Sequence, residues 1–109
     1  MTVSGTELSM VRGDTESITV TCPAAPFQAG DVLTLTIREG DVYGSIVLQK
    51  TISEFGADGS AVINIEHGDT TGLEMGSDYV YDIQLVQANG NYITIIKPSK
   101  FTIEEEVTY

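Results

Sequence analysis

The feature that most constrains the fold is an alternation of apolar and polar residues with a period of two, which recurs along most of the chain. Such alternation is typical of half-buried β-strands, and apolar residues at helical spacing do not continue beyond one turn. Between the alternating segments stand turn-favouring pairs such as Gly13-Asp14, Gly40-Asp41 and Asn89-Gly90. The pattern predicts strands at 7–12, 15–22, 32–38, 45–52, 60–66, 78–87, 92–97 and 100–104.

Seven to eight short strands at this spacing predict an all-β fold, either a sandwich or a small barrel, and we favour an immunoglobulin-like antiparallel β-sandwich. The length of 109 residues suits one domain, 1–109, with a single core. Between Glu66 and Gly76 the alternation stops, and residues 69–73 predict one short helical turn anchored by Leu73. Tyr79 or Tyr81 then lies where such domains have a tyrosine corner. The expected core comprises the apolar faces of the strands, with Ile18, Val20, Leu33, Leu35, Ile37, Ile63, Ile65, Tyr79, Tyr81, Ile83 and Leu85.

The register of the hairpin formed by 78–87 and 92–97 depends on the length of its loop. A two-residue loop of Asn89-Gly90 would leave Ile93 and Ile95 on the outer face. A three-residue loop, 88–90, with its glycine in a left-handed bulge position, places Leu85 opposite Ile93 and Ile83 opposite Ile95. We prefer the three-residue loop because all four apolar side chains then share one face.

This register predicts an outer face of the hairpin that is unusually apolar for a surface exposed to solvent. The candidate partner-binding residues on it are Val80, Val86, Tyr92 and Ile96. Scattered surface hydrophobes are normal in soluble proteins, so this interpretation and that of a contact patch for another subunit both stay open.

Segment 45–52 alternates less cleanly than the others. Lys50 shares the predicted face of Leu48 and Ile52. A lysine at such a position suits an edge strand that is protected against stray pairing.

Charge and apolar content exclude several classes of partner. Sixteen acidic residues against five basic ones give a net charge of −11, which repels phosphate backbones and anionic lipids, so we expect neither nucleic acid nor membrane as a partner. No apolar run approaches the ~18 to 20 residues of a membrane-spanning helix, and residues 1–5 lack the basic start of a signal peptide. The single cysteine, Cys22, suits a reducing compartment and is interpreted as a small core or edge residue.

The inventory of reactive residues predicts a protein that is not an enzyme. His67 is the only histidine, so nucleophile systems and metal clusters that need several histidines are excluded, and we expect His67 to be a surface or cap residue. The carboxylates are spread over turns and strand ends, with no calcium loop and no glycine-rich phosphate loop. Arg12-Gly13-Asp14 matches an adhesive tripeptide, but a hairpin turn is the preferred interpretation. We therefore predict no catalytic residue, no metal site and no cofactor.

Several segments together resemble one protein family. Residues 10–15, followed by Ile18-Thr19-Val20, then 48–52 and above all 79–85, resemble the N-terminal β-sandwich domain of phage baseplate upper proteins and related prophage tail proteins. Residues 69–73 look like the crossover of that family. The resemblance implies a structural subunit of the virion tail or baseplate, made in the bacterial cytoplasm. Its implied partners are other virion or tail proteins, and a second copy of the chain in a homo-oligomer.

A second function class remains open from the residues alone. A non-catalytic binding module, either a carbohydrate-recognition or an adhesion domain of a surface protein, would need an exposed aromatic platform. Tyr43 and Tyr92 are the only plausible members of such a platform, because the chain has no tryptophan.

Overall fold

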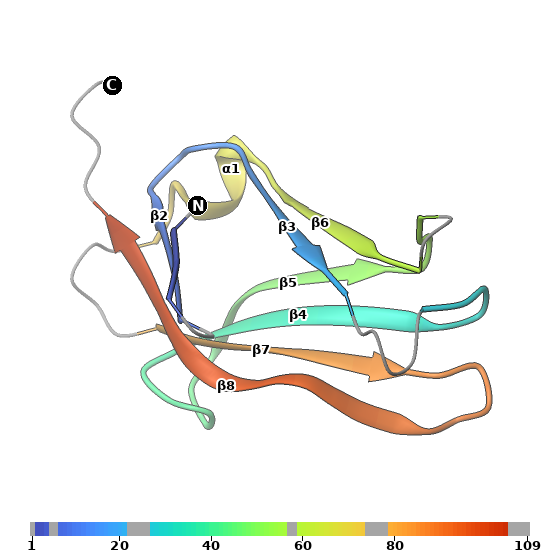
Figure 1. Ribbon diagram of the computed structural model, residues 1–109. Helices are drawn as coiled ribbons and strands as arrows, with labels where there is room; N and C mark the ends of the chain where they lie inside the picture. Colours follow the sequence, from blue (N-terminus) through green and yellow to red (C-terminus); the bar gives the residue numbers. More distant parts are fainter. Residues whose placement is uncertain (1, 5–6, 22–26, 57–58, 74–78, 105–109) are drawn as a thin grey trace.

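Two β-sheets make up most of the protein (Figure 1). The computed structural model describes residues 2–4, 7–21, 27–56, 59–73 and 79–104. A six-stranded sheet has the strand order β1-β2-β8-β7-β4-β5, and β3 pairs with β6 in a second sheet. The predicted all-β class is confirmed. The elements are β1 (Thr2–Ser4), β2 (Glu7–Val11), β3 (Glu16–Val20), β4 (Val32–Glu39), β5 (Ile46–Ile52), β6 (Ala61–Ile65), α1 (His67–Thr70), β7 (Tyr79–Val86) and β8 (Tyr92–Glu104).

The expectation of a wholly antiparallel arrangement is wrong at one pair, because β2 runs parallel to β8. No hairpin connects these strands, which lie near opposite ends of the chain, so local turn geometry does not set their direction. Burial stabilises the pair: Leu8 lies opposite Phe101 and Met10 opposite Ile103, and all four side chains are buried. The short strand β1, which pairs with β2, was not predicted, since three residues are too few to display an alternation.

The core lies between the two sheets, and every residue of the predicted core is buried. Leu33, Leu35 and Ile37 of β4 are fully inaccessible to solvent, as are Ile63 and Ile65 of β6. Burying one such side chain stabilises the fold by about 1.5–3 kcal/mol. Tyr81 packs edge-on against Phe101, with ring centroids 6.3 Å apart. Which tyrosine hydroxyl forms the corner bond stays a prediction, and residues 76–78 lie outside the described residues, as do Cys22 and Asp58.

The helical turn of the crossover is present but begins at His67, two residues before the predicted segment. The reason is the position of Asp69, which caps the helix from its third residue. Its carboxylate accepts a hydrogen bond of 2.8 Å from the backbone N–H of Glu66. Leu73 is buried, as expected of the anchor.

Strand β8 corrects two predictions. The expected strands 92–97 and 100–104 form one continuous strand, and Ile83 lies opposite Ile96 instead of Ile95. Leu85 does lie opposite Ile93, and Gly90 has the expected positive φ of 90° in a three-residue loop. An irregularity between Thr94 and Ile96 inserts one extra residue into β8, and this β-bulge changes the register beyond it.

Strand β5 is an edge strand, as predicted, because it closes one end of the six-stranded sheet and pairs only with β4. Its Lys50 Nζ lies 2.7 Å from Asp69 Oδ2 of α1. This ion pair joins the edge of the large sheet to the crossover that carries α1.

Candidate functional site

One row of apolar side chains crosses three strands on the outer face of the six-stranded sheet, which faces away from β3 and β6. Val32 of β4 lies opposite Val86 of β7, which in turn lies opposite Tyr92 of β8. The two valines are half-buried, whereas Tyr92 is 72% exposed. We call these three residues the apolar row. Directly opposed side chains lie about 4.5–5.5 Å apart at Cβ, so the row forms one continuous contact surface.

The loops beside the apolar row are tied together by a buried carboxylate. Asp31 is only 5% exposed and precedes Val32. Its Oδ1 accepts a hydrogen bond from the N–H of Ala88, and its Oδ2 accepts one from the N–H of Gln28, each of 3.0 Å. Gly30 has φ 92° and lies so close to Ala88 that a Cβ would come within 2.9 Å of the alanine Cβ. The row is therefore presented on a braced end of the sheet.

A polar belt separates the apolar row from the other end of the same face. Thr34, Gln84 and Thr94 lie opposite one another across β4, β7 and β8. Beside them, Gln49 Nε2 donates a hydrogen bond of 3.1 Å to Thr36 Oγ1. Beyond the belt lies Val80, six residues from Val86 and thus roughly 20 Å away along the strand.

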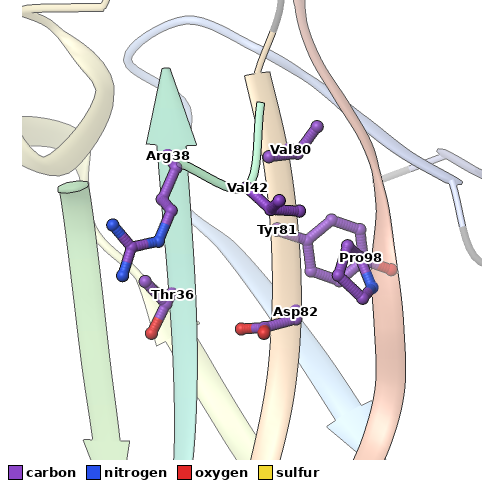
Figure 2. Close-up of a pocket in the computed structure, with 7 residues that line it drawn as sticks. All are labelled: Thr36, Arg38, Val42, Val80, Tyr81, Asp82 and Pro98. Carbon is purple, nitrogen blue, oxygen red and sulfur yellow. The ribbon is translucent and has the colours of Figure 1, made fainter. Parts of the chain in front are cut away.

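A small hollow marks that far end of the outer face (Figure 2). Its volume of about 50 Å³ suits a water molecule or two, far below the ~300–1,000 Å³ of a typical ligand pocket. The Arg38 guanidinium is partly engaged within the chain, since its Nη1 donates a 2.8 Å hydrogen bond to the carbonyl of Gly44. The hollow is lined by residues of β4, β7, β8 and the β4–β5 loop, namely Thr36, Arg38, Val42, Val80, Tyr81, Asp82 and Pro98.

The four residues predicted to bind a partner do not form one patch. Val86 and Tyr92 are brought together as a cross-strand pair, and Val80 stands apart beside the hollow. Ile96 is not on the outer face, which corrects the prediction, because the bulge in β8 sets it opposite Ile83 and packs it against the core. Val32 was missed, although its alternation with Thr34 and Thr36 could have placed it on the same face.

The two aromatic residues required for a binding platform are both exposed but lie far apart. Tyr43 is 91% exposed in the β4–β5 loop, whereas Tyr92 follows the β7–β8 loop at the opposite end of the sheet. In β4, Val32 marks the Tyr92 end and Glu39 the Tyr43 end. A single sugar ring cannot contact both tyrosines across such a distance.

The Arg12-Gly13-Asp14 segment is a turn packed against the crossover. Gly13 is buried with φ 83°, and the N–H of Asp14 donates a 3.1 Å hydrogen bond to the carbonyl of Val11. The Gly13 N–H donates to Thr70 Oγ1 at 2.8 Å, and its carbonyl accepts a hydrogen bond from His67 Nδ1 at 2.6 Å. His67 is thus an exposed helix residue that fastens this turn, in agreement with its predicted role as a surface or cap residue.

The pKa values of two groups, the Tyr81 hydroxyl and the Asp69 carboxyl, are shifted from their ordinary values. Burial raises the pKa of the Tyr81 hydroxyl. Partial burial also acts to raise the pKa of Asp69, but the hydrogen bonds from Lys50 and from the Glu66 N–H outweigh it, so that this pKa lies below its ordinary value. In the described ranges, no three side chains of His, Cys, Asp or Glu come together as a metal-binding group.

Comparison of the chain with protein-family models, curated proteins and solved structures finds no match. Among the helices of the described residues, none is long and apolar enough to cross a membrane.

Proposed function

We propose that this protein is a non-catalytic structural subunit of a phage or prophage tail or baseplate, which acts through protein–protein contacts. Its partners are other virion or tail proteins, and its site of action is the virion. The resemblance of residues 10–15, 48–52 and 79–85 to baseplate upper proteins supports the assignment to a tail. The apolar row supports the mode of action.

We further propose that the fold is an immunoglobulin-like sandwich of one domain. In the immunoglobulin scheme, the strands C, F and G form one sheet, C′ extends it in variable-type domains, and B and E pair in the other sheet. The order β8-β7-β4-β5 corresponds to G-F-C-C′, and the pair β3–β6 corresponds to B–E. This correspondence supports the finer fold, with β2 added beside β8.

The apolar row is the observation that carries the proposed mode of action. Tyr92 offers a large, mostly exposed ring, and tyrosine is enriched among residues that dominate binding energies. Val32 and Val86 extend the apolar surface beside it, and Asp31 holds the neighbouring loops in place. A rigid apolar row bordered by a polar belt has the organisation of an interface core with its rim.

A binding module for carbohydrate or for adhesion is the weaker candidate. The exposure of Tyr43 and Tyr92 favours it, but their separation leaves one tyrosine per end of the sheet. A glycan array distinguishes the two functions: hits that are lost in Tyr92→Ala favour the binding module, and an absence of hits favours the structural subunit.

Replacement of Val86 by arginine tests the proposed interface. Light scattering after size exclusion, over a range of protein concentrations, measures association of the chain with itself. A labelled chain, recovered with tail assemblies, measures its incorporation into them. We expect Val86→Arg to weaken association by tenfold or more, because it places a charge in the centre of the apolar row. Gln84→Arg is the matched control, since Gln84 is exposed two residues away on the same face.

Equal behaviour of Val86→Arg and Gln84→Arg would contradict the proposed interface. The tail assignment has an independent test in the neighbouring genes. Genes for tail-tube, tape-measure or lysis proteins support the assignment, and genes for sortases or polysaccharide synthesis contradict it.

A further inference from the structure

Strand β5 is less covered than the other strands whose side chains the structure describes. Among the strands whose side chains are described, it alone contains no buried residue, although Ile46, Val47, Leu48 and Ile52 make up more than half of it. Ile46 is 48% exposed at the start of the strand. One edge of β5 pairs with β4, and in the described residues no strand pairs with the other edge. An aliphatic edge strand of this kind is a template for pairing with another chain.

The lysine of β5 does not guard this edge. Lys50 forms an ion pair with Asp69 of α1. Its Nζ lies 2.7 Å from Asp69 Oδ2, and only 25% of the lysine side chain is exposed. Its charge is therefore already paired within the chain. Its methylene groups remain available to cover a neighbouring apolar side chain.

Charge and sequence symmetry favour a second copy as the occupant of the edge. Two chains of net charge −11 repel each other, but residues 42–53 contain no carboxylate, so the copies can meet there with the least repulsion. If β5 pairs with itself in antiparallel register about Gln49, Leu48 of each copy lies opposite Lys50 of the other and Val47 opposite Thr51. A shift that centres the pair on Lys50 would instead set two lysines opposite each other, which is unfavourable.

The same twofold symmetry brings the loop that carries Tyr43 in one copy close to the groove beside Phe55 in the other. Tyr43 lies six residues before Gln49, and Phe55 lies six residues after it. In a twofold antiparallel pair about Gln49, the start of β5 in one copy lies opposite its end in the other, Ile46 opposite Ile52, so the loops that carry Tyr43 and Phe55 are neighbours. Beside Phe55 is an open groove of about 320 Å³, in which the ring of Phe27 lies 5.3 Å from that of Phe55 between centroids. A third aromatic ring fits the preferred geometry of such clusters.

The loop that carries Tyr43 is built to hold it outward. The Tyr43 N–H donates a 2.9 Å hydrogen bond to Asp41 Oδ1, and the N–H of Gly44 donates one of equal length to the carbonyl of Asp41. Gly44 packs so closely against the carbonyl of Glu39 that no Cβ fits there. A pre-organised loop backbone loses little conformational freedom on binding.

We propose that two copies of this protein dimerise through β5, antiparallel about a twofold axis at Gln49, with Tyr43 of each copy in the Phe27–Phe55 groove of the other. The inference rests on the proposed function of protein–protein contact, but it concerns a different surface from the apolar row. The two interfaces lie on different parts of the large sheet, its edge and its outer face, so that one chain can use both in an assembly.

Disulfide trapping tests the position of the axis directly. In a Cys22→Ser background, Gln49→Cys sets the two introduced thiols opposite each other, at a Cα separation of about 4.5–5.5 Å that a disulfide spans. Thr51→Cys is the matched control, because Thr51 is exposed on the same face but its two copies would lie roughly 14 Å apart along the strands. We expect mild oxidation to convert the first variant, but not the second, into a dimer of twice the 11.7 kDa chain mass.

Truncation of Tyr43 tests whether its ring occupies the Phe27–Phe55 groove of the other copy. In a Val86→Arg background, in which association through the apolar row is removed, we expect Tyr43→Ala to raise the dissociation constant of the β5 dimer about 30-fold or more in light scattering. Tyr92→Ala removes the same ring from the apolar row and should leave this dimer within about twofold. Slow hydrogen exchange of the β5 amides at high, but not at low, protein concentration is expected independently of any variant.

Three results would overturn the inference: equal cross-linking of Gln49→Cys and Thr51→Cys, equal effects of Tyr43→Ala and Tyr92→Ala, or a chain that stays monomeric at millimolar concentration. Its failure is distinguishable from that of the proposed function. If both proposals hold, Val86→Arg disrupts assembly through the apolar row but leaves the Gln49→Cys cross-link intact. Loss of the cross-link alone contradicts the β5 dimer, and an unchanged assembly alone contradicts the apolar row.

Discussion

The contact between Thr70 and Gly13 provides a direct test of how the crossover is fastened to the sandwich. Thr70 is fully buried at the end of α1, and its Oγ1 accepts a 2.8 Å hydrogen bond from the N–H of Gly13. Replacement by valine preserves the volume and the branching of the side chain but removes the acceptor. The Gly13 N–H, which is buried, then loses the acceptor that it has in the folded chain.

The expected loss of stability follows from the desolvation of that N–H. An unsatisfied buried donor costs about 1–3 kcal/mol, and we take about 2 kcal/mol for Thr70→Val. For a chain of 109 residues the unfolding entropy is about 0.23 kcal/mol/K, so the melting temperature should fall by about 9 °C. With an m-value of about 1.5 kcal/mol/M, the urea midpoint should fall by about 1.3 M.

Urea denaturation followed by circular dichroism measures this effect, with two control variants. Thr70→Ser keeps the acceptor and should lose only about 1 kcal/mol for its missing methyl group. Thr71→Val removes the neighbouring hydroxyl, whose hydrogen bond to the Gly68 carbonyl is exposed, and should change stability by less than about 0.5 kcal/mol. The reasoning is refuted if Thr70→Val unfolds at the same midpoint as Thr71→Val.

Two further predictions concern charge and loop geometry. Because the pKa of Asp69 is lowered in the folded chain, the stability that it contributes is present above its ordinary pKa and is lost as the pH falls through the folded pKa. The free energy of unfolding, measured by urea denaturation from pH 6 to pH 2.5, should therefore fall less steeply for Lys50→Met than for the wild type, with a difference below about 1 kcal/mol. Parallel curves would contradict the role of the ion pair. Gly44→Ala should destabilise the protein by about 2–3 kcal/mol or rearrange its loop, because a Cβ overlaps the Glu39 carbonyl. Gly68→Ala, whose Cβ meets nothing within 4 Å, should be neutral or slightly stabilising, and similar midpoints for both glycine variants would show that the loop is not held as described.

The correct and the incorrect sequence predictions have different physical origins. The alternation in β4 and β7 identified strands and core together, because a residue on the wrong face would expose an apolar side chain to water. The bulge in β8 left no comparable signal. Ile95 and Ile96 are both apolar, so either can stand opposite Ile83, and the choice depends on how β8 bends to continue past Pro98 toward its pairing with β2.

For the candidate site, the sequence predicted two of the three residues of the apolar row, but it did not predict which strands bring all three together. Val86 and Tyr92 follow from the hairpin loop, because the loop length determines which residues lie opposite each other. Val32 joins them only through the pairing of β4 with β7, in which Val32 and Val86 lie 54 positions apart in the chain. Local patterns contain no information about such neighbours.

By itself, the sequence determined the class of the fold, most of its strands and the residues of its core, because the period of two, the turn residues and the cost of exposing apolar side chains act locally. The tertiary structure decided the order of the strands, the parallel pairing of β2 with β8 and the register of β8 beyond its bulge. These features depend on contacts between segments far apart in the chain, where core burial and backbone pairing are optimised together.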